Sequence, residues 1–210
     1  MNNLDKIYQQ TGLDAASFSR GYAEYLITLL QKLDHKKVAE CLEQMELARQ
    51  QENTVFIIGN GGSASTASHI ATDFGSAVLK KSNNHSVKPY RALSLTDNIA
   101  IISATANDSE YANIFLDQLR VHYRKGDKLI AISASGNSPN VVTAAKWFKE
   151  RGGTVMSWIG FDGGKLKELS DIAVVIDTPK GEYAPVEDMH LVVNHIMVTW
   201  MHYHIGNSEG

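Results

Sequence analysis

Two junctions in the chain carry the glycines and hydroxyl side chains that a bound phosphate group requires. They read Gly59-Asn60-Gly61-Gly62-Ser63 and Ser133-Ala134-Ser135-Gly136-Asn137-Ser138. Glycine allows the backbone to approach an anion closely, while hydroxyls and the free N–H groups of a following helix can donate to it. Neither junction has the lysine of a P-loop or a full Gly-x-Gly-x-x-Gly pattern, which favours a small phosphate monoester over a nucleotide. One such loop could be an ordinary turn, but two after apolar strands favour a site.

Four titratable side chains from two distant parts of the chain form a second candidate cluster. His69 and Asp73 are four residues apart, so they project from the same side of a helix. Glu187 and His195 are eight apart and share a broad side of the last predicted helix, from which His190 points away. Together, these groups could ligate a divalent metal such as zinc, or supply an acid and a base. Taken singly, each could be an ordinary surface or capped side chain.

These residues need a scaffold, and the apolar pattern predicts one. Strand-like runs occur at 55–58, 91–95, 128–133, 154–159 and 172–176. Helix-like segments occur between and after them, at 65–79, 98–106, 111–123, 139–151, 165–169 and about 186–203. Alternating helices and nearly continuous apolar strands predict an α/β fold with a parallel sheet covered on both faces.

The N-terminal region precedes every predicted strand and carries a different pattern. Apolar residues recur three and four apart over 18–33, and Asp34 can cap a second helix. We therefore predict an N-terminal helical hairpin in residues 1–52, ahead of one domain in residues 53–210. The apolar stripe of the hairpin packs either on its own domain or against another subunit.

Composition excludes several function classes. The 210 residues carry 20 basic and 23 acidic side chains, so no cationic excess points to nucleic acid or to an anionic membrane. The single cysteine, Cys41, cannot form an intrachain disulfide and favours a reducing compartment. The N-terminus is polar, unlike a signal peptide, and no apolar run approaches the roughly 20 residues of a spanning helix. We expect a soluble, cytoplasmic protein.

Four strings, in this order, resemble the sugar isomerase (SIS) family and match best its sedoheptulose-7-phosphate isomerase, or phosphoheptose isomerase, branch. They are Gly59 to Ser63, Ser133 to Ser138, Gly160-Phe161-Asp162-Gly163-Gly164-Lys165 and Glu187-Asp188-Met189-His190. The resemblance implies a flavodoxin-like or Rossmann-like three-layer sandwich with a five-stranded parallel sheet. It also implies a homotetramer assembled through its helices, with active sites at subunit interfaces.

The resemblance further implies an activity and its residues. The reaction is conversion of D-sedoheptulose 7-phosphate into D-glycero-D-manno-heptose 7-phosphate through an enediol, the first step toward nucleotide-activated heptose for lipopolysaccharide or related glycans. Asp73 would be the base and His195 the acid, with one zinc ion per subunit and no organic cofactor. The metal ligands would be His69, Asp73, Glu187 and His195. The substrate contacts would be Asn60, Gly61, Gly62, Ser63, Asp73, Asn107, Asp108, Ser133, Ala134, Ser135, Ser138 and Glu187.

Three departures from the family pattern leave the exact ketose phosphate open. Asp73 stands where the family has Glu, Glu187 stands where it has Gln, and Ala134 replaces a frequent hydroxyl residue. An isomerase for another ketose phosphate is therefore one alternative. The other is a non-catalytic phosphosugar-binding SIS protein, acting as a regulator or as a replication-initiator-binding factor. Retention of all four titratable residues favours an enzyme.

Overall fold

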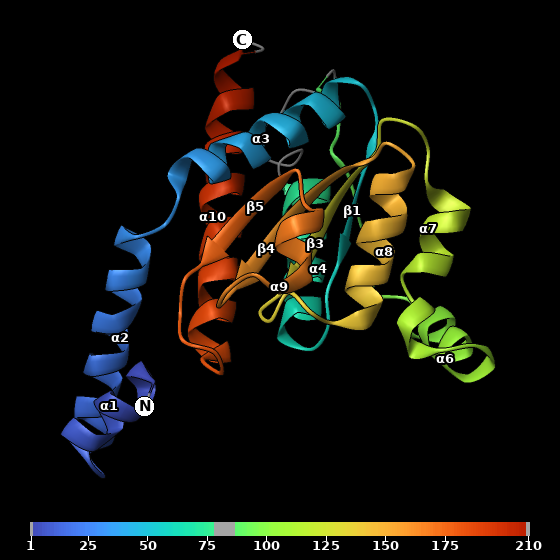
Figure 1. The fold of residues 1–210 in the computed structure, drawn as a ribbon. Coiled ribbons are helices and arrows are strands. Elements are labelled where there is room, and N and C mark those ends of the chain that lie inside the picture. The colour runs from blue at the N-terminus through green and yellow to red at the C-terminus, as the bar shows by residue number, and fades with distance from the viewer. Residues whose placement is uncertain (1, 78–86, 209–210) are drawn as a thin grey trace.

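The fold, seen in a computed structural model that describes residues 2–77 and 87–208, is built on one parallel sheet (Figure 1). Its five strands lie in the order β2-β1-β3-β4-β5. They are β1 (Thr54–Ile58), β2 (Arg91–Ser94), β3 (Lys128–Ser133), β4 (Thr154–Gly160) and β5 (Ile172–Ile176). Because β1 and β3 are neighbours in register, the two glycine- and serine-containing junctions that follow them meet at the same edge of the sheet. The predicted five-stranded α/β fold is confirmed.

Helices cover both faces of the sheet and complete the three layers. Their bounds are α1 (Asn3–Thr11), α2 (Ala15–Gln31), α3 (His35–Gln50), α4 (Gly62–Thr72), α6 (Ile99–Asp108), α7 (Leu116–His122), α8 (Pro139–Glu150), α9 (Gly164–Leu169) and α10 (Tyr183–Ser208). One face packs against α3, α4 and α10, and the opposite face packs against α7, α8 and α9. Among the described residues, no helix combines the length and the apolar character needed to cross a membrane.

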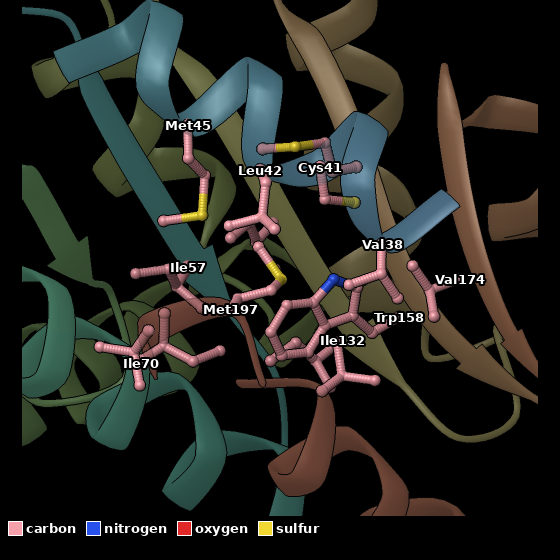
Figure 2. Packing of buried hydrophobic residues seen from close by; sticks show 14 of the residues in the cluster. Val38, Cys41, Leu42, Met45, Ile57, Ile70, Ile132, Trp158, Val174 and Met197 are labelled. Carbon is pink, nitrogen blue, oxygen red and sulfur yellow. The ribbon is translucent and has the colours of Figure 1, made fainter. Parts of the chain in front are cut away.

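The core on the α3, α4 and α10 side explains how these helices are held in place. Trp158 of β4 lies at its centre with no exposed surface, and Met45 of α3 and Met197 of α10 close around the same strands (Figure 2). Ile70 packs there from α4. The helices α4 and α10, which carry the titratable residues, are therefore fixed relative to the sheet by one continuous apolar cluster.

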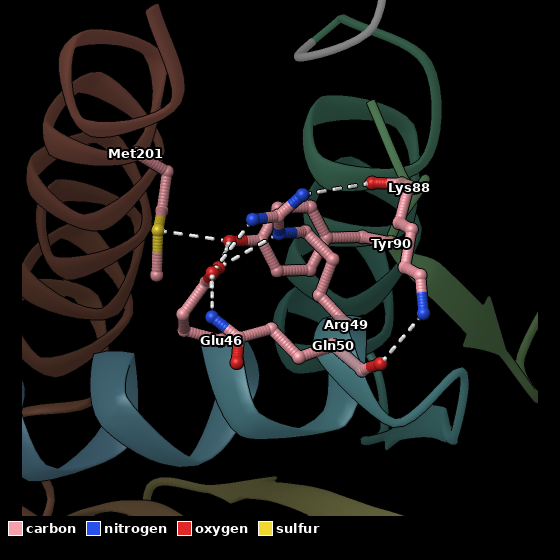
Figure 3. A network of polar contacts seen from close by, with 6 residues as sticks. All are labelled: Glu46, Arg49, Gln50, Lys88, Tyr90 and Met201. Carbon is pink, nitrogen blue, oxygen red and sulfur yellow. Dashed lines mark hydrogen bonds and ion pairs between the residues drawn. The ribbon is translucent and has the colours of Figure 1, made fainter. Parts of the chain in front are cut away.

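A polar network adds a second connection between α3 and α10. Glu46 of α3 accepts hydrogen bonds from Arg49, at 2.8 and 2.7 Å, and from the Tyr90 hydroxyl at 2.8 Å. The same hydroxyl lies 2.9 Å from the sulfur of Met201 in α10 (Figure 3). Arg49 is almost fully buried and also donates to the Lys88 carbonyl oxygen at 3.2 Å. The segment leading into β2 is thereby tied to both helices.

The N-terminal helices are present, but their arrangement differs from a simple hairpin. Asp34 caps α3 through bonds to the backbone N–H groups of Lys36 and Lys37, at 3.0 and 3.1 Å. From there α3 lies along the sheet, whereas α2 extends beyond the domain and packs against α1 and α10 (Figure 1). The apolar stripe of α3 is therefore covered by its own sheet, whereas in α2 Leu29 is buried, Tyr25 and Leu26 are only partly buried, and Ile27 is exposed.

Three helix boundaries also differ from the sequence-based expectation. The helix predicted over 65–79 begins at Gly62 and ends at Thr72, where a π-helical turn, Asp73–Ala77, continues it; positions 78 and 79 lie outside the described residues. The segment predicted over 111–123 divides into a 3₁₀ turn, Tyr111–Asn113, and α7. The last helix begins three residues earlier than expected, because Pro185 is tolerated in a first helical turn.

Candidate active site

A pocket of about 150 Å³ opens where the β1–α4 and β3–α8 junctions meet. Its lining residues are Asn60, Ser63, Ile132, Ser133, Ala134, Ser135, Ser138, Tyr183 and Glu187. Seven of these nine were predicted as substrate contacts from the sequence. Among the described residues that line the pocket, none is a lysine or an arginine. Within this lining, hydroxyls, the Asn60 side-chain amide and backbone N–H groups can donate hydrogen bonds to an anion.

Two helices begin beside the pocket and provide those dipoles. Gly61 precedes α4 with a positive φ of 54°, and Ser138 precedes α8, whose first residue is Pro139. Within the described chain, the Ser138 hydroxyl makes no capping bond to α8 and instead lies 3.2 Å from the Ser133 hydroxyl. Free N–H groups and the positive ends of two helix dipoles favour a phosphate at this position.

The serine-containing loop is supported from behind by the loop that begins at Gly160. The Gly160 N–H donates to the Ala134 carbonyl at 2.9 Å, and the Leu166 N–H donates to the Gly136 carbonyl at 3.0 Å. Gly136 has φ of 62°, and a Cβ placed on it would lie only 1.9 Å from the carbonyl oxygen of Gly163. The glycine at position 136 is therefore required by both backbone conformation and space.

Asn60 is held in place by partners that the sequence reasoning missed. Its side-chain amide pairs reciprocally with that of Asn140, with bonds of 2.9 and 2.8 Å. The Tyr111 hydroxyl also donates to the Asn60 side-chain oxygen at 3.1 Å. Asn140 is 1% exposed, so this amide pair is fixed within the interior beside the pocket. The signal in the sequence that could have predicted this amide pair is Asn140, which directly follows Pro139 at the start of α8.

Besides Ile132, Tyr183 is the lining residue that was not predicted from the sequence. It is the first residue of α10, and its ring packs edge-on against Phe161 with ring centroids 5.2 Å apart. Phe161 has a positive φ of 56°, an unusual conformation for a residue other than glycine. Thus the loop that supports the serines also fixes the wall opposite them.

A second group of functional side chains lies further along α4 and α10. The Nε2 atoms of His69 and His195 are 3.3 Å apart, and Asp73 Oδ2 is 3.2 Å from His69 Nε2. The Asn194 side chain donates to Asp73 Oδ2 at 2.7 Å and thereby orients the carboxylate. Asp73 begins the π-helical turn, a type of irregularity that is frequent at functional sites.

The donor set and spacing of this cluster fit a zinc ion. The ligand atoms of His69, Asp73 and His195 all lie within 4.8 Å of one another. Tetrahedral zinc bound to imidazole nitrogens at about 2.0–2.1 Å separates its ligands by roughly 3.3 Å, which agrees with the two distances above. Two imidazole nitrogens at this spacing can share either a proton or a cation.

Glu187 lies apart from the zinc-compatible cluster. Its carboxylate is so close to Gly62, the first residue of α4, that a Cβ on this glycine would lie 2.2 Å from Oε2. Burial, followed by the nearby charge of Asp188, raises the pKa of Glu187 above its ordinary value. Along α10, the eight-residue step to His195 corresponds to about 12 Å. Glu187 therefore lines the phosphate-sized pocket, and its assignment as a metal ligand stays a prediction.

Asn107 and Asp108, the remaining predicted contacts, lie at the end of α6. The Asn107 side chain donates to Asp108 at 2.8 Å, and both residues are exposed. Neither lines the pocket. Their role in substrate binding also stays a prediction.

Comparison with known proteins connects this geometry to a family. The family model described as SIS domain matches residues 21–160. A phosphoheptose isomerase of Helicobacter pylori strain Shi470 is 36% identical over 184 residues, covering 86% of this chain and 88% of the relative. The chain belongs to the SIS domain family, in its phosphoheptose isomerase branch. A phosphoheptose isomerase of Clostridium acetobutylicum is 38% identical over 146 residues, or 68% of this chain and 69% of the relative.

Two solved structures have folds similar to that of this chain. The phosphoheptose isomerase of Neisseria gonorrhoeae superimposes with a TM-score of 0.75 at 29% identity, covering 87% of this chain and 95% of that one. The Vibrio vulnificus NanR protein complexed with ManNAc-6P gives a TM-score of 0.63 at 18% identity, covering 95% of this chain and 68% of that one. The second likeness shows the fold alone.

Proposed function

We propose that this chain is an aldose–ketose isomerase that interconverts D-sedoheptulose 7-phosphate and D-glycero-D-manno-heptose 7-phosphate. The observation that carries the proposal is the position of two unlike sites on the same pair of helices. Glu187 lies against Gly62 at the start of α4, and His195 meets His69 two turns further along. The helices α4 and α10 therefore run side by side in the same direction, with an anion pocket at one level and an acid–base cluster at the next.

The spacing between the two levels suits a seven-carbon sugar phosphate. Gly62 and His69 are seven residues apart on α4, which corresponds to about 10 Å along the helix axis. An extended seven-carbon chain spans roughly 8 Å from its first to its last carbon. When the phosphate lies beside Ser133 and Ser135, the carbonyl end of the substrate therefore reaches His69 and His195.

We assign the proton transfers to Asp73 and His195. Asp73, oriented by Asn194, removes a proton from C1 of the ketose, while His195 gives a proton to the C2 carbonyl oxygen, forming an enediol. Removal of the proton from the C1 hydroxyl and delivery of a proton to C2 complete the aldose. The phosphate pocket fixes the distance between the reacting carbons and these groups.

His69, Asp73 and His195 would hold the zinc ion. When bound, zinc would polarise the carbonyl and hydroxyl oxygens of the substrate as a Lewis acid. With Nε2 of both histidines and Oδ2 of Asp73 facing the ion, Asp73 Oδ1 and His195 Nδ1 would be the atoms that hold and move the protons. Glu187 lines the same pocket, where burial raises the pKa of its carboxyl group and so lowers the free-energy cost of protonating it beside a phosphate.

We further infer that the protein assembles as a homotetramer through its helices, with residues 1–52 contributing to the contacts. A groove of about 630 Å³ separates α3 from α10, and its lining includes Leu42, Leu47, Ile196 and Trp200. Trp200 is 47% exposed although it is large and apolar. Light scattering should find four chains per particle, and Trp200→Glu should reduce that number.

Turnover of defined ketose phosphates tests the proposed reaction. The zinc-loaded protein should convert sedoheptulose 7-phosphate more efficiently than fructose 6-phosphate, measured as kcat/KM by product chromatography. The shorter sugar does not reach the histidines when its phosphate occupies the pocket. Binding of sedoheptulose 7-phosphate without any conversion would contradict the proposal and favour a non-catalytic SIS protein.

A further inference from the structure

Glu182, the residue directly before α10, has an unusual environment for an acidic side chain. It has no exposed surface, yet it lies at the junction of three helices. Its carboxylate accepts a hydrogen bond from the backbone N–H of Asn3, the first residue of α1, and another from the Tyr25 hydroxyl of α2. The Asn3 side chain also donates to the Tyr25 oxygen at 2.9 Å, so the three residues form one connected group.

The chemistry of this contact explains why it stabilises the junction. The first N–H groups of a helix have no partner within the helix, and a negative charge is favoured near them. Glu182 supplies both the acceptor and the charge to α1, while Asn3 and Tyr25 provide the hydrogen bonds that a buried carboxylate requires. The N-terminal helices and the residue before α10 are therefore connected by a contact that neither segment can form alone.

A second contact from α2 lies nearly two turns further along, at Asp188 of α10. The Tyr22 hydroxyl donates to the Asp188 carboxylate at 2.5 Å. Tyr22 and Tyr25 therefore bond to residues on both sides of Tyr183 and Glu187. These two flanked residues are the ones that α10 contributes to the phosphate-sized pocket.

We propose that the α1–α2 segment positions the pocket wall of the active site, with Glu182 and Tyr25 as the principal positioning residues. The first turn of a helix opens readily, because its N–H groups lack partners. The bonds to Glu182 and Asp188 hold this turn of α10 closed, so that Tyr183 and Glu187 stay against the serine-containing loop. Neither Glu182 nor Tyr25 lines the pocket. This inference rests on the proposed function, because it assigns the pocket to the substrate phosphate.

The variant Tyr25→Phe tests the inference with little structural disturbance, since it removes one hydroxyl. The matched control is Tyr8→Phe in α1, because Tyr8 is 53% exposed and its ring packs edge-on against Phe18. Three quantities should be measured: amide hydrogen exchange over residues 182–189, the Kd of inorganic phosphate by calorimetry, and KM with kcat for sedoheptulose 7-phosphate.

For Tyr25→Phe we expect amide hydrogen exchange to be about tenfold faster in residues 182–189, at the start of α10. Exchange in the strands of the sheet should be unchanged. The phosphate Kd and KM should rise about three- to tenfold, while kcat stays within about twofold, because the histidines and Asp73 are not displaced. Glu182→Gln keeps an acceptor oxygen for Tyr25 and should have a smaller effect than Glu182→Ala. Tyr8→Phe should match the unaltered protein in every measurement.

The results separate this inference from the proposed function. Unchanged exchange and unchanged phosphate affinity in Tyr25→Phe would overturn the positioning role, whatever the enzyme assay shows. If kcat fell by the same factor as KM rose, the positioning role would also be overturned, because the variant would then disturb the whole site. If no isomerisation occurs but the exchange and phosphate results follow expectation, the proposed reaction fails and the positioning role stands.

Discussion

The Nε2 atoms of His69 and His195 lie 3.3 Å apart, although 126 residues separate them in the chain. No steric requirement of the core brings them together, since both side chains are partly or largely exposed. Two basic nitrogens held at this distance favour a shared cation, and Asp73 adds the negative charge that such a cation requires.

Removal of either histidine should therefore abolish zinc binding. His69→Ala and His195→Ala should each retain less than about a tenth of the zinc of the unaltered protein, because each substitution removes a residue that would bind the metal directly. Zinc is measured by elemental analysis after dialysis. The exposed His122 of α7 is the control, and His122→Ala should keep its zinc. Equal zinc in all three variants would place the metal elsewhere.

Loss of a serine hydroxyl from the pocket should weaken substrate binding without slowing chemistry. Ser133→Ala and Ser135→Ala should each raise KM about two- to tenfold, the equivalent of one hydrogen bond, with kcat within about twofold. The exposed Ser103 of α6 donates to the Ala100 carbonyl of its own helix at 3.2 Å and does not line the pocket, so Ser103→Ala should have no effect. Unchanged KM in both pocket variants would show that the phosphate binds at another position.

The two loops that form and support the pocket should depend on the absence of a side chain at Gly136. Gly136→Ala combines an unfavourable φ with a contact of 1.9 Å to the Gly163 carbonyl. Gly152 has a φ of 78° with nothing within 4 Å of an added Cβ, so Gly152→Ala isolates the backbone cost of about 1–2 kcal/mol. Urea unfolding should show a loss for Gly136→Ala at least about 2 kcal/mol larger, together with weaker phosphate binding. Equal losses in the two variants would contradict the close packing of these loops.

Stability should fall in acid because of His190. Complete burial lowers the pKa of its imidazole from 6.5 to about 4. Between these values the unfolded chain binds a proton that the folded chain does not, so stability is full above about pH 6.5 and falls as the pH approaches 4. The full shift corresponds to about 3 kcal/mol. His190→Leu should flatten the urea-unfolding profile between pH 7 and 4, and an equally steep profile in that variant would exclude His190 as the cause.

The sheet and the pocket could be predicted from the sequence because their determinants are local. Apolar strands followed by glycine and serine predict loops at one edge of a parallel sheet, and the four-residue step from His69 to Asp73 predicts a shared helix face. The grouping of those residues with His195 was a hypothesis from residue type that the family resemblance then supported, because spacing within α10 does not say which helix lies opposite.

The remaining features depend on tertiary packing and left little local signal. Asn140 and Asn194 are amides whose partners come from other elements, Asn60 and Asp73. Glu187 was grouped with His195 because both lie on one broad side of the helix, but the two residues are about 12 Å apart along the helix axis. The hydrogen bonds from α1 and α2 to Glu182 join segments about 160 or more residues apart, and no pattern within either segment predicts them.

The position of solvent-derived deuterium in the product tests the central assignment most directly. The zinc-loaded protein is incubated with sedoheptulose 7-phosphate in deuterated water, and the sugars are followed by proton NMR. Proton transfer through Asp73 and His195 predicts heptose 7-phosphate carrying deuterium at C2, with Asp73→Asn slowing its formation at least about 10²-fold while still binding phosphate. Two results would contradict this assignment. One is conversion by Asp73→Asn at the rate of the unaltered protein. The other is an unaltered protein that binds phosphate but leaves both C1 protons on sedoheptulose 7-phosphate.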